Sequence, residues 1–404
     1  MQPWTVLERR QEKGEGNPLS AAVRPWRATV VLAGSIWLGF TLLRWVALAT
    51  TEFAKPDHGQ LADGVAGWAN LPNHYDASWL IGIAESGYAT DGAPMNRAFF
   101  PGYPLLIRGL ALLLGLGSLN HAAVLAAALL LTSISCLVAT TLVLRIAEDQ
   151  WGRRAGPFAA TLLMAWPTAT FLTALYSEPV YLAFASASWW AGCRRRWWLA
   201  GGLCAAASLI RINGLFLLAA LLVMFVVIRR RDAEPFAPWP LVGLGVGSLG
   251  TVAYAVYLWW ATGEWSGWFG AQAVGWGRHL AWPWTSLGTT VDRAFGAQGL
   301  APEEVAQHVV DMVTVIAAIG LLVYLARRRL WPELTLTFVT LSVLVTSTYY
   351  LSVARNTLTI LPVFVVGGSL LSWARPTTAY AILGVSTMWM VGTTVLFRIP
   401  LWAG

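Results

Sequence analysis

Long apolar segments separated by short arginine clusters constrain this chain more than any other feature of its sequence. Of its 404 residues, 57% are hydrophobic and only 12% are charged, whereas soluble domains carry about a quarter charged residues. The arginine clusters lie between the apolar segments, at 24–27, 145–154, 194–196, 229–231, 327–329 and 375. This pattern predicts an all-α polytopic membrane protein.

The arginine clusters also predict how the chain crosses the membrane. Cytoplasmic loops carry an excess of Lys and Arg, and a span needs about 17–25 residues. If every cluster is cytoplasmic, each interval between clusters crosses an even number of times, which predicts about eleven transmembrane helices. We expect a cytoplasmic tail at 1–27, a membrane domain at 28–404, and large outer loops at 51–120 and 263–307. We expect 103–116 to form an interfacial helix, because a full span there would break the even count.

Five ionisable residues meet on the outer side of this predicted topology. They are Asp76, Glu178, Arg211, Arg278 and Arg355. Several of them lie at the tips of predicted helical hairpins, where the excess of positive charge on the inner side does not explain an arginine. Ionisable groups at membrane depth are energetically costly and are candidates for function.

Four of these residues also have purely structural interpretations. Asn73 can cap a helix, with Asp76 closing a capping box three residues later. Glu178 precedes a proline and can face the dipole at a helix N-terminus. Arg211 and Arg355 can extend toward lipid headgroups. These interpretations stay open at the level of the sequence.

The composition argues against several other classes of protein. Three cysteines, with no metal-ligand spacing, predict neither a disulfide framework nor a zinc site. His74 is interpreted as a polar interface residue, because no second ligand lies at a suitable spacing. We expect no metal and no cofactor, since the outer loops contain no Asp-x-Asp pair or histidine cluster. The net charge of +7 is expected to meet lipid headgroups and no nucleic acid.

A motif in the first outer loop carries a family resemblance. The sequence reads YD at 75–76, IAESGY at 83–88 and FFPGYP at 99–104. It resembles the PIG-V-like mannosyltransferases, whose signature joins an aromatic-Asp pair to Ile-Ala-Glu-x-Gly-Tyr and Phe-Phe-Pro-x-aromatic-Pro. The family usually has Trp before the Asp, and often Arg before that Trp, where this chain has Tyr75 and His74.

Shorter segments extend the resemblance over roughly residues 30–370. They are LYSEP at 175–179, SLIRINGLFL at 208–217, FGAQAVGWGR at 269–278 and SVARNTLTILPVF at 352–364. The resemblance implies a GT-C type bundle, and an inverting, metal-independent transfer from a polyprenyl (dolichyl-type) phosphate mannose donor. The use of Arg over Lys and the richness in Ala and Gly favour a bacterial source. It implies a lipid- or glycan-linked acceptor and an active site on the outer face of a bacterial plasma membrane, or on the lumenal face of the endoplasmic reticulum in a eukaryote.

The resemblance also implies roles for individual residues. Asp76 would be the catalytic base. Arg211, Arg278 and Arg355 would bind the donor phosphate, with Lys55 as a weaker candidate. The candidates for binding acceptor or sugar are Glu178, Tyr88, Gln272, Trp276 and Asn213.

Other functions remain open at this stage. Tyr88 and Trp276 can also be interface anchors. The enzyme can use another polyprenyl-phosphate sugar, or the chain can be a multi-span lipid or sugar transporter or flippase. Transporters usually bind their cargo near the midplane on broken helices, whereas the polar groups here gather in outer loops and hairpin tips.

Overall fold

The computed structural model describes residues 24–54, 65–88, 94–115, 117–233, 235, 237–296 and 299–399. Most of the predicted cytoplasmic tail, part of the first outer loop and Lys55 lie outside these residues. Within them the secondary structure is helical apart from an isolated antiparallel bridge between Leu280 and Ser347. The predicted all-α class is therefore confirmed.

Within the described residues, six helical segments are long and apolar enough to cross a membrane. They are α2 (Trp26–Ala54), α6 (His121–Trp151), α10 (Asn213–Arg231), α11 to α12 (Trp239–Gly245 and Leu249–Thr262, joined by η4, Val246–Ser248), α15 (Pro302–Arg327) and α19 (Pro376–Arg398). A seventh span results if the bent segment formed by α17 (Val353–Asn356), η5 (Thr357–Thr359) and α18 (Leu361–Trp373) is counted once. These lengths are typical of a multi-span membrane protein.

The predicted number of about eleven spans is not confirmed by helix length. The additional helices α7 (Ala155–Met164), α8 (Glu178–Cys193), α9 (Trp197–Ile210) and α16 (Trp331–Val345) have 10, 16, 14 and 15 residues. The hydrocarbon core needs about 20 helical residues. The arginine clusters predict how often the chain turns back at one side of the membrane, but not how long each helix is. The number of eleven spans therefore stays a prediction.

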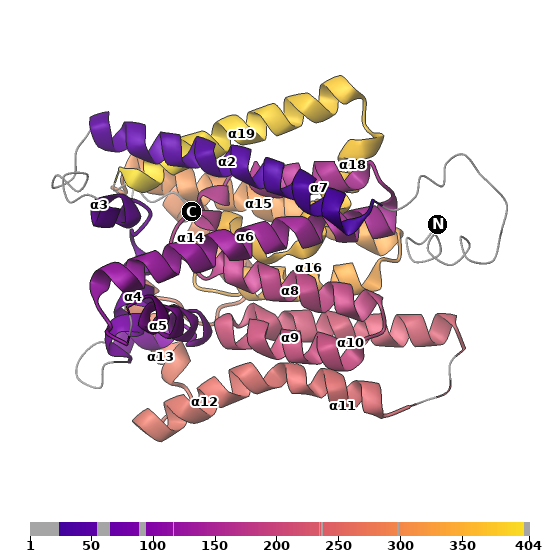
Figure 1. Ribbon diagram of the computed structural model, residues 1–404, viewed down its shortest axis with the longest axis horizontal. Coiled ribbons are helices and arrows are strands. Elements are labelled where there is room, and N and C mark those ends of the chain that lie inside the picture. Colours follow the sequence, from indigo (N-terminus) through magenta and orange to yellow (C-terminus); the bar gives the residue numbers. More distant parts are fainter. Residues whose placement is uncertain are drawn as a thin grey trace.

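The two ends of the molecule differ in structure (Figure 1). At one end, on the left of Figure 1, lie α3 (Val65–Asn70), α4 (Asp76–Ser86), α5 (Gly102–Leu114) and α13 (Gly267–Trp276). We call this the loop end. The connections α6–α7, α8–α9, α10–α11, α15–α16 and α18–α19 lie at the opposite end, which we call the arginine end.

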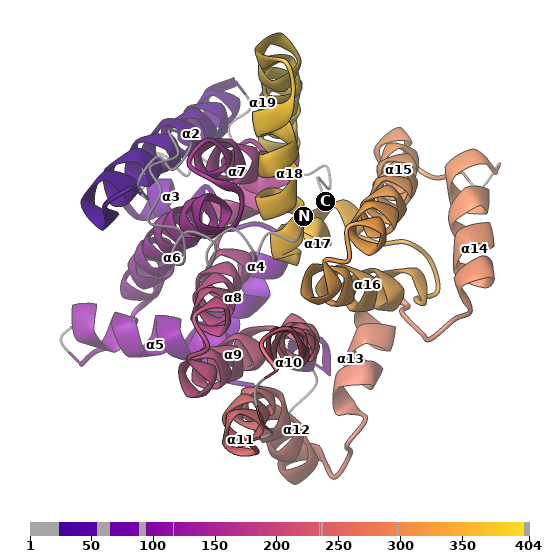
Figure 2. The same cartoon turned by 90° about the vertical axis from the view of Figure 1, so that its right-hand side faces the viewer.

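Helices of the predicted outer loops run across the bundle. Figure 2 shows α5 and α14 (Pro283–Phe295) from the side, whereas most of the long helices are seen nearly end-on. The helix predicted at 103–116 therefore exists as α5 and does not run along the bundle. Its position at a membrane interface stays a prediction.

Helices α7 and α18 pack closely together in the core of the fold. A Cβ atom added at Gly368 would lie 2.5 Å from the backbone of Ala159, so only a residue without a side chain fits there. Small residues let membrane helices approach closely. The buried side chains of Leu163, Phe171 and Phe364 belong to the same core, which holds the N-terminus of α8 and the segment around α17 in place.

Candidate active site

Four charged side chains from separate parts of the sequence form one cluster. Arg355 donates from Nε to Glu178 Oε1 at 2.7 Å and from Nη1 to Asp76 Oδ2 at 2.7 Å. Arg211 Nη1 lies 3.1 Å from Glu178 Oε1. Glu178 is fully buried and Arg355 is 8% exposed. The structure thus brings together one predicted catalytic residue, one predicted acceptor residue and two predicted phosphate-binding residues.

Helix N-termini position both carboxylates of the cluster. Asp76 is the first residue of α4, and Glu178 is the first residue of α8 with Pro179 after it. Anionic side chains are stabilised there by the helix dipole, and proline suits the first turn. The structural interpretation of Glu178 holds, but it does not exclude the ion pairs with Arg211 and Arg355.

The capping box predicted for Asn73 is wrong. Tyr75 precedes α4 and no side chain caps the helix, while Asn73 Nδ2 donates to Asn70 Oδ1 at 2.8 Å. The carboxylate of Asp76 instead binds Arg355. Asp76 is therefore available for a role outside its own helix.

Arg211 and Arg355 do not extend to lipid headgroups. Arg211 donates from Nη1 to Ser177 Oγ at 2.9 Å and from Nη2 to Asn356 Oδ1 at 3.2 Å. The Cζ of Arg355 lies 4.4 Å from the ring centroid of Tyr176, a cation–π contact. Both side chains are fixed by several contacts, so their cationic groups are held in place before any ligand binds.

The backbone is strained immediately before Asp76. Tyr75 has φ 54° and ψ −123°, and Ala77 N–H donates to the His74 carbonyl at 3.1 Å. These values correspond to the first central position of a type II′ turn, which glycine normally occupies. A non-glycine residue in this region costs about 1–3 kcal/mol. Tyr176 contacts this turn through its hydroxyl, and burial, followed by the charge of Asp76, raises the pKa of that hydroxyl.

Arg278 lies in the loop after α13, where its Nε donates to Ser347 Oγ at 3.1 Å. Burial lowers the pKa of Arg278, the charges of Tyr349 and Asp311 raise it, and the positive charge of Arg355 lowers it further. Among the described residues no hydrogen bond or ion pair joins Arg278 to the cluster, so its role in binding the donor phosphate stays a prediction. An anion would relieve the cost of desolvating its positive charge.

Asn213 contributes to the support of the cluster. Its Nδ2 donates to Thr359 Oγ1 at 3.0 Å, and its carbonyl accepts from the hydroxyl of Tyr181 at 3.1 Å. These contacts join α10, η5 and α8. A direct contact of Asn213 with an acceptor stays a prediction.

The structure does not connect Tyr88, Gln272 and Trp276 to Asp76 by any contact among the described residues. Tyr88 donates from its hydroxyl to the Phe99 carbonyl at 2.6 Å. The carbonyl of Gln272 accepts from the backbone N–H of Arg278 at 3.3 Å. The ring of Trp276 lies edge-on to Phe99, with 5.8 Å between centroids. Their proposed roles in binding sugar stay predictions.

Sequence reasoning missed Asp311, which lies on α15. Its Oδ1 accepts from the backbone N–H of Ala354 at 2.9 Å, at the start of the short helix α17 that carries Arg355. A single Asp within the apolar run of 302–327 was a usable signal, because charges inside spans are rare.

Sequence reasoning also missed the surroundings of His74. Its Nε2 lies 3.1 Å from Arg398 Nη1, and Arg398 forms a buried ion pair with Glu52. His74 is thus packed against α19, and its position at a membrane interface stays a prediction. Among the described residues, no group of three or more His, Cys, Asp or Glu side chains could hold a metal ion.

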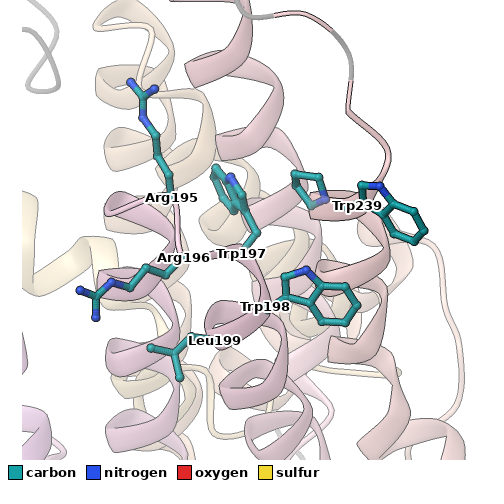
Figure 3. A pocket seen from close by; sticks show the side chains of 7 residues that line it. Arg195, Arg196, Trp197, Trp198, Leu199 and Trp239 are labelled. Carbon is teal, nitrogen blue, oxygen red and sulfur yellow. The ribbon is translucent and has the colours of Figure 1, made fainter.

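A surface pocket at the arginine end is a separate feature. It has a volume of about 430 Å³ and is lined by Arg195, Arg196, Trp197, Trp198, Leu199, Trp239 and Pro240 (Figure 3). Figure 3 shows Arg196 pointing away from the rings of Trp198 and Trp239. The pocket adjoins the C-terminal end of α8, about 22 Å along the helix from Glu178 at 1.5 Å per residue. It does not adjoin the charged cluster.

Comparisons with known proteins agree with the resemblance seen in the sequence. A family model described as mannosyltransferase (PIG-V) matches residues 58–231. The human protein named GPI alpha-1,6-mannosyltransferase 2 is 32% identical over 171 residues, which cover 39% of this chain and 31% of that protein. The chain thus matches less than a third of the human relative. Asp76, Glu178 and Arg211 lie within the matched family region, whereas Arg278 and Arg355 lie beyond it.

A solved structure supports the predicted fold class. ArnT from Cupriavidus metallidurans, bound to undecaprenyl phosphate, superimposes with a TM-score of 0.52 and 14% identity. The similarity covers 88% of this chain and 62% of ArnT. At this identity it shows the fold alone, and it confirms a GT-C-like arrangement of helices.

Proposed function

We propose that this chain, whose residues 58–231 match the family model described as mannosyltransferase (PIG-V), is a membrane glycosyltransferase of that family. It transfers mannose from polyprenyl phosphate mannose to a lipid- or glycan-linked acceptor. The observation that carries the proposal is the contact of Asp76 with Arg355, which also binds Glu178 beside Arg211. A proton acceptor and fixed cations therefore lie side by side, as this transfer requires.

Asp76 acts as the general base. A sugar hydroxyl is a weak nucleophile, and a carboxylate that accepts its proton in the transition state accelerates the attack. Attack by the hydroxyl oxygen on the anomeric carbon of mannose forms the new glycosidic bond. The bond from that carbon to the phosphate oxygen breaks on the opposite side, so the configuration inverts.

The arginines stabilise the leaving lipid phosphate. Asp76 and Glu178 carry two negative charges, which Arg211 and Arg355 balance with two positive charges. Arg278 adds a positive charge, and burial lowers the pKa of its guanidinium. A phosphate anion bound there would compensate this buried positive charge. Fixed donors of this kind act on charge that develops in the transition state.

Two findings support the proposed donor lipid. The family description names mannosyl transfer, and the ArnT structure of similar fold holds undecaprenyl phosphate. We extend both to this chain as a mannose carried on a polyprenyl phosphate. The cluster would face the outer side of a bacterial plasma membrane, because the arginine end suits the cytoplasmic side.

A transfer assay tests the proposal. Purified protein in lipid nanodiscs receives polyprenyl phosphate mannose with radiolabelled mannose, together with a glycolipid extract as the acceptor. We expect label in the acceptor fraction, and a fall in rate of about 100-fold or more in the Asp76→Asn variant, which keeps the shape of the side chain but loses the base. Thermal unfolding of both proteins serves as the control for folding.

Two results would contradict the proposal. Asp76→Asn with nearly normal turnover would remove Asp76 from the mechanism. Movement of intact lipid-linked sugar across the bilayer of proteoliposomes, without label in any acceptor, would favour the transporter alternative.

A further inference from the structure

The side chain of Tyr176 forms hydrogen bonds to the residues on both sides of the strained turn before Asp76. The backbone N–H of Asp76 donates to the hydroxyl of Tyr176 at 3.1 Å. That same hydroxyl donates to the carbonyl of His74 at 3.1 Å. The two bonds span Tyr75, whose φ of 54° is unfavourable for any residue except glycine.

The position of Tyr176 is itself fixed by the core. Tyr176 is fully buried, and its ring packs edge-on against Phe171, with 5.0 Å between centroids. The guanidinium of Arg355, which binds the carboxylate of Asp76, lies over this ring, with its Cζ 4.4 Å from the ring centroid. The same phenol thus contacts the backbone of Asp76 and the partner of its side chain.

We propose that Tyr176 is a positioning residue that holds the Tyr75 turn closed and thereby directs the Asp76 carboxylate toward the acceptor. This inference rests on the proposed function of Asp76 as the base. The hydroxyl of Tyr176 donates a hydrogen bond to the His74 carbonyl and accepts one from the backbone N–H of Asp76. Both capacities are therefore used by the turn, and Tyr176 acts through it. Without the hydroxyl, the strain at Tyr75 favours opening of the turn and displacement of Asp76.

The test uses Tyr176→Phe, which removes the hydroxyl and keeps the ring beside Arg355. We expect kcat to fall by about 10- to 100-fold, because small misplacements of a catalytic group have effects of this size. The donor KM should change little, since the arginines keep their contacts. Tyr103→Phe is the matched control: this buried tyrosine loses its bond to Thr132 Oγ1. Among the described residues no hydrogen bond joins Tyr103 to the turn, so its kcat should stay near wild type.

A second variant, at position 75, distinguishes loss of the hydrogen bonds that hold the turn from a general loss of packing around Tyr176. Glycine at position 75 adopts the turn without strain, so Tyr75→Gly should make the hydroxyl of Tyr176 less important. In a double-mutant cycle, Tyr176→Phe should lower kcat less in the Tyr75→Gly background than in the wild type. An equal loss in both backgrounds, or an equal loss in Tyr103→Phe, would overturn the proposal.

Hydrogen exchange gives a readout that does not depend on activity. Tyr176→Phe should increase the exchange of the backbone amides of Asp76 and Ala77, whereas Tyr103→Phe should not. Unchanged exchange at these amides would contradict the proposal that Tyr176 holds the turn closed. If exchange increases in Tyr176→Phe but even the wild type transfers no sugar, the role of Tyr176 in holding the turn is supported and the proposed function is contradicted.

Discussion

Arg355 contacts both acidic side chains of the cluster through different nitrogen atoms. Nε binds Glu178 and Nη1 binds Asp76, so among the described residues Nη2 keeps the capacity to donate to a further acceptor. A planar guanidinium can thus hold two carboxylates and a phosphate through separate nitrogen atoms in a fixed geometry, whereas lysine presents all its donors from one nitrogen. The site is therefore arranged around one arginine whose position depends on both carboxylates.

The arginines should affect donor use more than acceptor use. We expect Arg355→Ala and Arg211→Ala each to raise the donor KM more than the acceptor KM, because the lost cation faces the leaving phosphate. Steady-state kinetics with both substrates varied measures this difference. Arg194→Ala is the control, since Arg194 binds Asp149 at 2.9 Å near the arginine end and should leave the donor KM unchanged. Equal effects on both substrates would contradict the assignment to phosphate.

Transfer should not need a divalent metal ion. The two carboxylates that could approach a cation are bound to Arg355, and fixed arginines can neutralise a single phosphate. We expect purified protein to transfer mannose from polyprenyl phosphate mannose in excess EDTA, and not to use a nucleotide-linked mannose. Activity that EDTA abolishes and Mn²⁺ restores would contradict this expectation.

The residues of the cluster differ in how far the sequence predicts them. Asp76, Glu178, Arg211 and Arg355 were identified because charges near apolar segments are rare and costly. Tyr176 gave no such signal, because an aromatic residue beside an apolar segment is usual at membrane interfaces. Its contact with the turn before Asp76 depends on how distant segments pack together.

Among the elements, the turn between α9 and α10 has little room for a larger residue at Gly214. It carries Arg211, and Gly214 lies in the first turn of α10. A Cβ atom added at Gly214 would lie 2.3 Å from the Cα of Ser208. Glycine is thus required by the close approach of two backbones, and this approach sets the position of Arg211.

Gly214→Ala should therefore displace the turn and its arginine. We expect a lower thermal midpoint and strongly reduced transfer. Gly202→Ala on α9 is the matched control, because a Cβ there meets nothing within 4 Å and alanine favours a helix by about 1 kcal/mol. Differential scanning fluorimetry and the transfer assay measure both variants. Equal stability of the two variants would show that the turn can adapt.

Helix boundaries were more predictable than the number of spans. The apolar runs and their flanking charges predict spans at 239–262 and 377–397, and helical segments occupy Trp239–Thr262 and Pro376–Arg398. Apolar length and flanking charge determine such boundaries. Whether a helix of 10 residues such as α7 crosses the membrane depends on its partners, which the sequence pattern does not contain.

At the scale of the whole molecule, the two ends carry different chemistry. The charged cluster contains the N-terminal residues of α4 and α8, and α4 belongs to the loop end (Figure 1). The turns rich in arginine lie at the opposite end. Because positive residues favour the cytoplasmic side, this asymmetry predicts one orientation, with the loop end outside.

Cysteine labelling on intact cells tests this orientation. The native Cys136, Cys193 and Cys204 are replaced by alanine, and single cysteines are introduced as Ser86→Cys, Thr285→Cys or Ala237→Cys, all at exposed positions. Ser86 ends α4 and Thr285 lies on α14, so both should react with a membrane-impermeant maleimide. Ala237, between α10 and α11, should react only after the cells are permeabilised. Labelling of Ala237→Cys alone on intact cells would place the loop end in the cytoplasm, and the donor would then have to be used on the inner leaflet.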